Sequence, residues 1–129
     1  MSALRLHMKA GERLFLNGTV VAVDRRCALT ILGEASFLRE AYVMQVEDAS
    51  TPLRRLYFTV QGMIIGGADA SAALDAGVRI EQLLAAARSP DLVAGLLDAR
   101  EALPEKPHHA LRALRPLFSI EDARLEEAA

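Results

Sequence analysis

The sequence predicts an α+β fold in which a small N-terminal antiparallel β-sheet or partial barrel is followed by an antiparallel helical array. Two observations lead to this prediction. Residues 4–9 alternate between apolar and polar side chains, and short apolar runs separated by turn residues follow up to residue 32, which is typical of short strands. From residue 50 onward, apolar side chains recur every three or four positions, which is the period of a helix. We therefore expect a β-rich half (1–48) and a helical half (49–129) that pack as one compact unit.

The β half contains three or four short candidate strands separated by turns. Residues 4–9 alternate strictly, so one face of this strand is expected to pack on a core. The next two apolar runs flank Asn17 and Gly18, and an Asn-Gly pair in this setting predicts a hairpin with positive φ at both residues. A second polar turn at residues 24–26 leads into a further apolar run at 27–32.

The first predicted helix begins at Thr51 and Pro52. A hydroxyl side chain caps the free N–H groups of a helix, and proline at the first helical position has no N–H to lose. The following apolar residues fall on one helical face, and Gly66 and Gly67 end the pattern. The predicted buried face consists of Leu53, Leu56, Tyr57, Val60, Met63 and Ile64.

Three further helices are expected after this one. The Ala- and Leu-rich residues 70–87 predict the second helix, and Ser89 with Pro90 opens the third. Residues 108–115 predict a short fourth helix that Pro116 ends or kinks, and the acidic tail from Ser119 is expected to fray. The predicted core positions of the second helix are Leu74, Val78 and Leu84.

Charge is distributed unevenly along the chain. The net charge is −2, but residues 1–55 carry eight Lys or Arg against six Asp or Glu, whereas residues 56–129 carry seven against eleven. Arginine binds phosphate through two parallel hydrogen bonds and stacks on bases. Contacts to a nucleic acid are therefore predicted for Arg5, Lys9, Arg13, Arg25, Arg26, Arg39, Arg54 and Arg55. The alternative is ordinary surface ion pairing, for Arg54 and Arg55 with Glu47 or Asp48 just upstream.

No pattern of catalytic or metal-binding residues stands out. The single cysteine, Cys27, lies in an apolar run with no evident base, so we expect a buried structural thiol. His108 and His109 are adjacent, which is the wrong spacing for two ligands on one helix face. We expect neither an enzyme, nor a metal site, nor a cofactor. A lone thiol, the lack of a signal-peptide pattern and the lack of an apolar run of about 18 residues favour a cytoplasmic protein without membrane association.

Several short motifs, in this order, resemble the FlbT family, the flagellum biosynthesis repressors of alphaproteobacteria. The first motif is Leu-x-Leu-x-x-Lys-x-Gly-Glu-Arg at residues 4–13. The other motifs lie at residues 17–18, 24–26, 37–40, 51–58 and 113–118. The resemblance implies a post-transcriptional regulator that acts at the 5′ untranslated region of flagellin mRNA, lowering its translation and lifetime, or activating it in some bacteria. It also implies FlaF as a functional companion, and it implies no catalytic residues.

A fainter likeness connects the N-terminal half to the carbon storage regulators, which are small dimeric RNA-binding β proteins. Residues 11–16, the β-rich run after them and residues 39–40 carry this likeness. It implies RNA contacts from Lys9 on the first strand and from Arg39 near the end of the sheet.

Two hypotheses of function remain open from the sequence. The first is direct binding of RNA by the basic β half, with phosphate contacts and stacking on unpaired bases. The second is a protein-interaction module, in which the acidic helical half presents a face to flagellin, to FlaF or to a second copy of the chain. The two are compatible, since each half could bind one partner.

Overall fold

The predicted α+β fold is confirmed by the structure, a computed structural model that describes residues 3–33, 35–66, 70–103 and 105–128. The described β half contains the strands β1 (Ala3–Met8), β2 (Arg13–Leu16), β3 (Thr19–Ala22), β4 (Cys27–Leu32) and β5 (Phe37–Arg39). Two short 3-10 helices, η1 (Glu40–Tyr42) and η2 (Val46–Asp48), connect these strands to the helical half.

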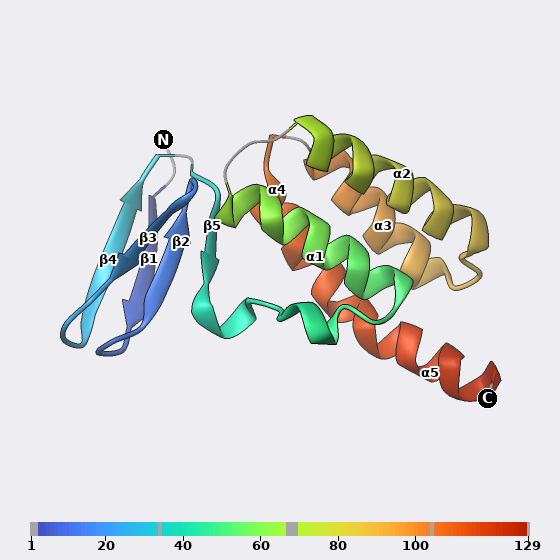
Figure 1. The fold of residues 1–129 in the computed structure, drawn as a ribbon, viewed down its shortest axis with the longest axis horizontal. Coiled ribbons are helices and arrows are strands. Elements are labelled where there is room, and N and C mark those ends of the chain that lie inside the picture. Colours follow the sequence, from blue (N-terminus) through green and yellow to red (C-terminus); the bar gives the residue numbers. More distant parts are fainter. Residues whose placement is uncertain (1–2, 34, 67–69, 104, 129) are drawn as a thin grey trace.

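The helical half is an array of α-helices that lies beside the strands (Figure 1). Its described elements are α1 (Pro52–Ile65), α2 (Ala70–Ala86), α3 (Pro90–Ala102), α4 (Pro107–Leu114), the 3-10 helix η3 (Arg115–Leu117) and α5 (Phe118–Ala128). Helix α1 contacts α2, α4 and α5 as well as strands β2 and β5, so it is the element that joins the two halves.

The strands pair in two small antiparallel sheets. Strands β1 and β4 form one sheet, and the other has the order β3-β2-β5. The predicted hairpin joins β2 and β3, with φ of 48° at Asn17 and 82° at Gly18. In contrast, β4 does not pair with β3, which precedes it in the sequence. It pairs with β1, because the turn after β3 crosses from one sheet to the other.

The three-stranded sheet lies between the other sheet and the helices. Neighbouring residues of a strand point to opposite faces. Leu14 of β2 therefore packs with Leu6 and Met8 in a small β core, whereas Phe15 and Leu38 pack against the helical core. Cys27 belongs to the β core but is half-buried, not fully buried as expected. The result is three layers: two strands, three strands and helices.

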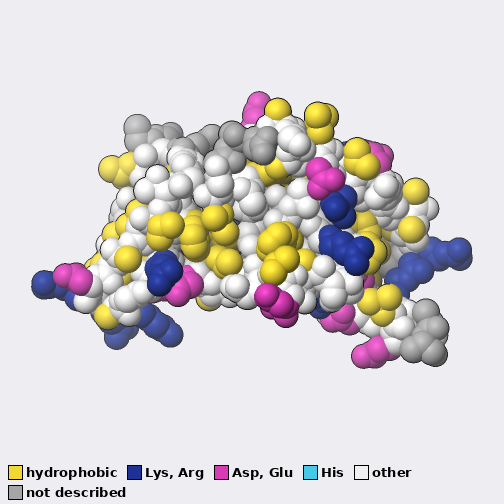
Figure 2. Space-filling model, viewed as in Figure 1, with side chains coloured by type: hydrophobic (Ala, Val, Ile, Leu, Met, Phe, Trp, Pro, Cys, Tyr) yellow, Lys and Arg dark blue, Asp and Glu magenta, His cyan; other side chains and the backbone are white. Residues whose placement is uncertain are grey.

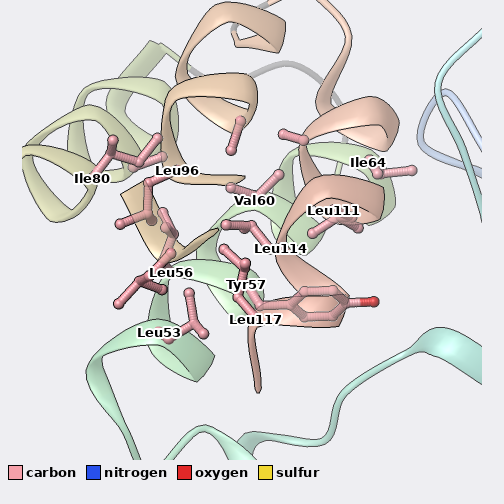
Figure 3. Close-up of a cluster of buried hydrophobic side chains, with 14 of the residues drawn as sticks. Leu53, Leu56, Tyr57, Val60, Ile64, Ile80, Leu96, Leu111, Leu114 and Leu117 are labelled. Atoms are coloured by element: carbon pink, nitrogen blue, oxygen red, sulfur yellow. The ribbon is translucent and has the colours of Figure 1, made fainter. Parts of the chain in front are cut away.

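The main hydrophobic core lies among the helices, and α1 supplies its centre (Figure 3). Thr51 caps α1, because its hydroxyl oxygen accepts the N–H of Arg54 at 3.2 Å. All six apolar residues predicted for the buried face of α1 are buried. All of them except Met63 belong to a cluster that also contains Ile80 of α2, Leu96 of α3 and Leu114 of α4, so four helices share one core.

Two features of the helical half differ from the sequence prediction. On α2, Leu74 and Val78 are 73% and 56% exposed, and the buried positions are instead Ala76 and Ile80. The small side chain of Ala76 lets α2 approach the neighbouring helices closely. The buried face was predicted wrongly because apolar residues occur on several sides of α2. The acidic tail, expected to fray, forms the helix α5 up to Ala128, and Glu121 and Asp122 attach the start of α5 to α1.

Within the described ranges, no helix combines the length and apolar character needed to cross a bilayer. In the same part of the chain, no three or more His, Cys, Asp or Glu side chains gather as a metal ion would require.

Candidate nucleic-acid interface

Two turns of the β half bring several of the predicted basic residues to one end of the molecule. The turn between β1 and β2 lies against the start of the turn between β3 and β4, since the N–H of Gly11 donates to the carbonyl of Val23 at 2.8 Å. We call this end the β tip, and its basic residues are Lys9, Arg13, Arg25 and Arg26. In Figure 2, Lys and Arg side chains gather at this outer end, with acidic side chains among them.

Most of the predicted basic residues are available to a ligand. Exposed side chains that make no ion pair with any described residue belong to Arg5, Lys9, Arg13, Arg26 and Arg55. Arg25 lies 3.7 Å from Asp24, but both side chains are more than four-fifths exposed, so this pair is solvated and weak. Arg5 lies along β1, opposite Thr30 of β4, and Arg55 lies in the first turn of α1, away from the β tip.

Arg39 is held in the structure by an acidic partner. Its Nη2 atom donates to the carbonyl of His7 at 2.6 Å and to the carboxylate of Glu12 at 3.1 and 3.2 Å. The same carboxylate accepts the backbone N–H of Lys9 at 3.0 Å. This backbone hydrogen bond, followed by the Arg39 hydrogen bond and charge, holds the pKa of Glu12 below its usual value against the opposing effect of burial. Arg39 therefore neutralises Glu12, which leaves the exposed cations to dominate the β tip.

Arg54 joins the start of α1 to α5. Its guanidinium donates to both carboxylate oxygens of Asp122 at 2.8 and 3.0 Å and to Glu121 at 3.2 Å. Glu121 also accepts the hydroxyl of Thr51 and the N–H of Leu53, so it completes the cap of α1. The predicted pairing of Arg54 with Glu47 or Asp48 is wrong, because Arg54 pairs instead with Glu121 and Asp122, which are far away in the sequence.

A second group of basic residues, not predicted from the sequence, lies on α4 and η3. Arg115 lies over the ring of Tyr42, with its guanidinium carbon 4.0 Å from the ring centroid. Its Nε atom also donates to the hydroxyl of Tyr57 at 3.1 Å. Arg112 is exposed and lines a cleft between α4 and the strands. Both residues belong to the acidic half, so a count of charge by halves concealed them.

Comparison with known proteins identifies the family. The chain matches the family described as "Flagellar protein FlbT" over residues 4–125. It belongs to the FlbT family. Two relatives, from Rhizobium johnstonii and Chelativorans sp. (strain BNC1), are 44% and 40% identical over 125 and 124 residues. These alignments cover 94% of this chain in each case, and 83% and 85% of the relatives. A relative from Brucella ovis is 38% identical over 125 residues, covering 93% of this chain and 80% of its own.

All three relatives are named "Probable flagellum biosynthesis repressor protein FlbT". No solved structure matches the chain significantly.

Three of the motifs that resembled the FlbT family lie close together in the structure. Arg39 comes from the motif at residues 37–40, Tyr57 from the motif at 51–58, and Arg115 from the motif at 113–118. Tyr57 and Arg115 are hydrogen-bonded to each other. Arg39 and Arg115 line one cavity beside α4. Residues from motifs that are far apart in the sequence of this FlbT-family chain are therefore neighbours in the structure.

Proposed function

We propose that this FlbT-family protein is a non-catalytic regulator of flagellin synthesis that binds the 5′ untranslated region of flagellin mRNA. Bound there, it represses translation or promotes decay of the message. The relatives named as flagellum biosynthesis repressors support the regulatory role. The observation that carries the RNA contact is the β tip, where Lys9, Arg13, Arg25 and Arg26 are exposed. Of the carboxylates there, Glu12 is neutralised by Arg39, and Asp24 makes only a solvated pair with Arg25.

The electrostatics of the β tip favour a phosphate backbone over a single small anion. Lys9, Arg13, Arg25 and Arg26 project from two adjacent turns, so their charges are spread along the end of the sheet. Each phosphate that such a cation neutralises releases a counterion, and the affinity for a single strand then depends on salt with a log–log slope of about 0.7 per contact.

Binding of a flagellin leader RNA, measured by fluorescence anisotropy over a range of salt concentrations, tests the proposal. The double variant Arg25→Gln/Arg26→Gln should bind at least about tenfold more weakly at low salt, and its salt slope should fall by about 1.4. The matched control is Arg88→Gln/Arg124→Gln, which removes two charges from residues that pair with no described carboxylate and lie outside the β half. Equal binding by the two double variants would sink the proposal.

A second candidate function is a protein-interaction module, and one observation favours it. Leu74 and Val78 are one helical turn apart on α2 and are largely exposed, and Leu97 of α3 is 39% exposed. Exposed apolar side chains in a row on a helix are typical of a surface that another protein covers. FlaF, flagellin or a second copy of the chain would be the partner, and the effect on RNA would then be indirect.

This alternative is tested with the intact chain. Purified FlaF or flagellin is titrated into the protein and into the variant Leu74→Ser/Val78→Ser, and the heat of binding is recorded. Loss of binding in the variant, with RNA binding unchanged, would favour the interaction module. Sedimentation of the protein alone reveals whether the same substitutions disrupt a homo-oligomer.

A further inference from the structure

A cleft between α4 and the strands has the lining of an anion site. Its smaller cavity, of about 220 Å³, is lined by Arg39, Arg112 and Arg115 together with His108 and Tyr42. No carboxylate appears among the described residues that line this cavity. Three guanidinium groups around one small cavity, without an acidic residue on its wall, make a strongly attractive site for a phosphate group.

Arg115 is positioned in advance for such a ligand. Stacking on Tyr42 fixes the plane of its guanidinium group, and the hydrogen bond from Nε to Tyr57 fixes its rotation. The Tyr57 hydroxyl in turn donates to the carbonyl of Tyr42 at 2.7 Å. Within the described residues, neither Nη atom of Arg115 has a hydrogen-bond partner, so its outer donors remain for a ligand.

Arg112 adds a second donor on the same side. It lies three residues before Arg115, so the two side chains are neighbours along the helix surface. No described carboxylate lies within 4.0 Å of the Arg112 guanidinium. The ion pair with Glu12 offsets most of the attraction that Arg39 would exert on an anion. Arg112 and Arg115 are therefore the principal phosphate ligands of this site.

An adjoining larger cavity supplies room for a nucleoside. It measures about 460 Å³ and shares Phe37, His108 and Arg112 with the smaller cavity. The rings of Phe37 and His108 lie 5.2 Å apart between centroids at the boundary of the two cavities. Aromatic rings beside a guanidinium group are the usual platform for an unpaired base, which stacks on them while its phosphate is bound. The larger cavity also falls within the range of about 300–1,000 Å³ typical of small-molecule sites.

We propose that this cleft, formed by α4, β1 and β5, binds one unpaired nucleotide of the RNA, with its phosphate between Arg112 and Arg115 and its base against Phe37 and His108. This inference rests on the proposed RNA binding and adds a nucleotide subsite to it. Arg39 contacts Glu12 near the β tip and also lines the cleft. Arg39 therefore connects the β tip to the cleft.

The variant Arg112→Gln tests the subsite, because the Arg112 side chain is exposed and makes no ion pair with a described residue. Its matched control is Arg88→Gln, which removes one exposed and unpaired charge between α2 and α3, at the end of the helical array away from the strands (Figure 1). A single-stranded leader RNA and uridine monophosphate are each titrated into the full-length proteins. We expect Arg112→Gln to weaken RNA binding about tenfold and to lower the salt slope by about 0.7, and Arg88→Gln to do neither.

The outcomes separate the two proposals. If Arg112→Gln binds RNA as the wild type does while the Arg25→Gln/Arg26→Gln variant binds weakly, the subsite is overturned and the proposed function stands. If neither the wild type nor any variant binds RNA, the proposed function fails. If uridine monophosphate still binds the wild type but not Arg112→Gln, the cleft is a nucleotide site but not a site for RNA. Recovery of most of the salt slope in Arg112→Lys would support a direct phosphate contact.

Discussion

Replacing Tyr57 by phenylalanine removes one oxygen atom that connects three parts of the molecule. Tyr57 is 2% exposed, and its ring packs edge-on against Phe118, with ring centroids 5.3 Å apart. Its hydroxyl donates to the carbonyl of Tyr42 and accepts from Nε of Arg115. The substitution preserves the packing of the ring but breaks both hydrogen bonds, so it isolates their contribution.

The expected loss of stability follows from the two hydrogen bonds. A buried hydrogen bond between neutral groups contributes about 1 kcal/mol, and one to a charged group contributes about 1.5–3 kcal/mol. Arg115 is only partly buried, so water replaces some of what its Nε loses. We expect Tyr57→Phe to lower the free energy of unfolding by about 2 kcal/mol, which for a chain of 129 residues lowers Tm by roughly 8 °C.

Tyr42→Phe is the matched control for this variant. Tyr42 is 49% exposed, and its hydroxyl has no partner among the described residues, although its ring still supports Arg115. Its free energy of unfolding should therefore stay within about 0.5 kcal/mol of the wild type. Urea unfolding followed by far-ultraviolet circular dichroism measures both variants. A Tyr57→Phe protein as stable as Tyr42→Phe would refute the idea that the Tyr57 hydroxyl holds Arg115 and the segment before α1 in place.

Two further predictions concern the helical half. Arg54→Gln should destabilise the protein at pH 7, and this difference should shrink as the pH falls below about 4. The Arg54 hydrogen bond holds the pKa of Asp122 below its usual value, so that contribution exists above the unfolded pKa and is lost when Asp122 is protonated; urea unfolding at pH 7 and pH 3 measures it. Gly62→Ala should stabilise α1 by about 1 kcal/mol, because a Cβ there meets nothing within 4 Å. Gly95→Ala should instead destabilise by about 1 kcal/mol, because its Cβ would lie 2.7 Å from the Leu117 methyl groups; equal Tm values for the two alanine variants would contradict this.

Local sequence signals predicted the elements whose causes are local. Thr51 and Ser89 act as helix caps, and Asn17 with Gly18 forms the hairpin, because each effect involves residues only a few positions apart. Strand β5 was not foreseen, since three residues are too few to display a period. The pairing of β4 with β1 was not foreseen either, because strand partners depend on which sheet buries each apolar face.

The candidate site could be predicted only in part, for a related reason. Exposed cations at turns, such as Arg25 and Arg26, can be read from the sequence, since turn residues lie at the surface. The partner of Arg54 could not be predicted from the sequence, because Asp122 lies on α5, 68 positions further along the chain. The role of Arg115 could not be predicted either, because its contact with Tyr42 depends on the fold.

The proposed RNA binding gives the two basic regions different roles, because they contain different side chains. The β tip offers cations but no aromatic side chain, since residues 8–13 and 22–27 include none. Contacts to phosphate position a nucleic acid without reading its sequence, so the β tip alone would bind any single strand with similar affinity. A regulator that acts on one message must also distinguish bases, and the α4 cleft is where cations and aromatic rings come together. Substitutions at the β tip should therefore weaken binding of all RNA sequences alike, whereas Arg112→Gln should reduce the preference for the leader over an unrelated strand.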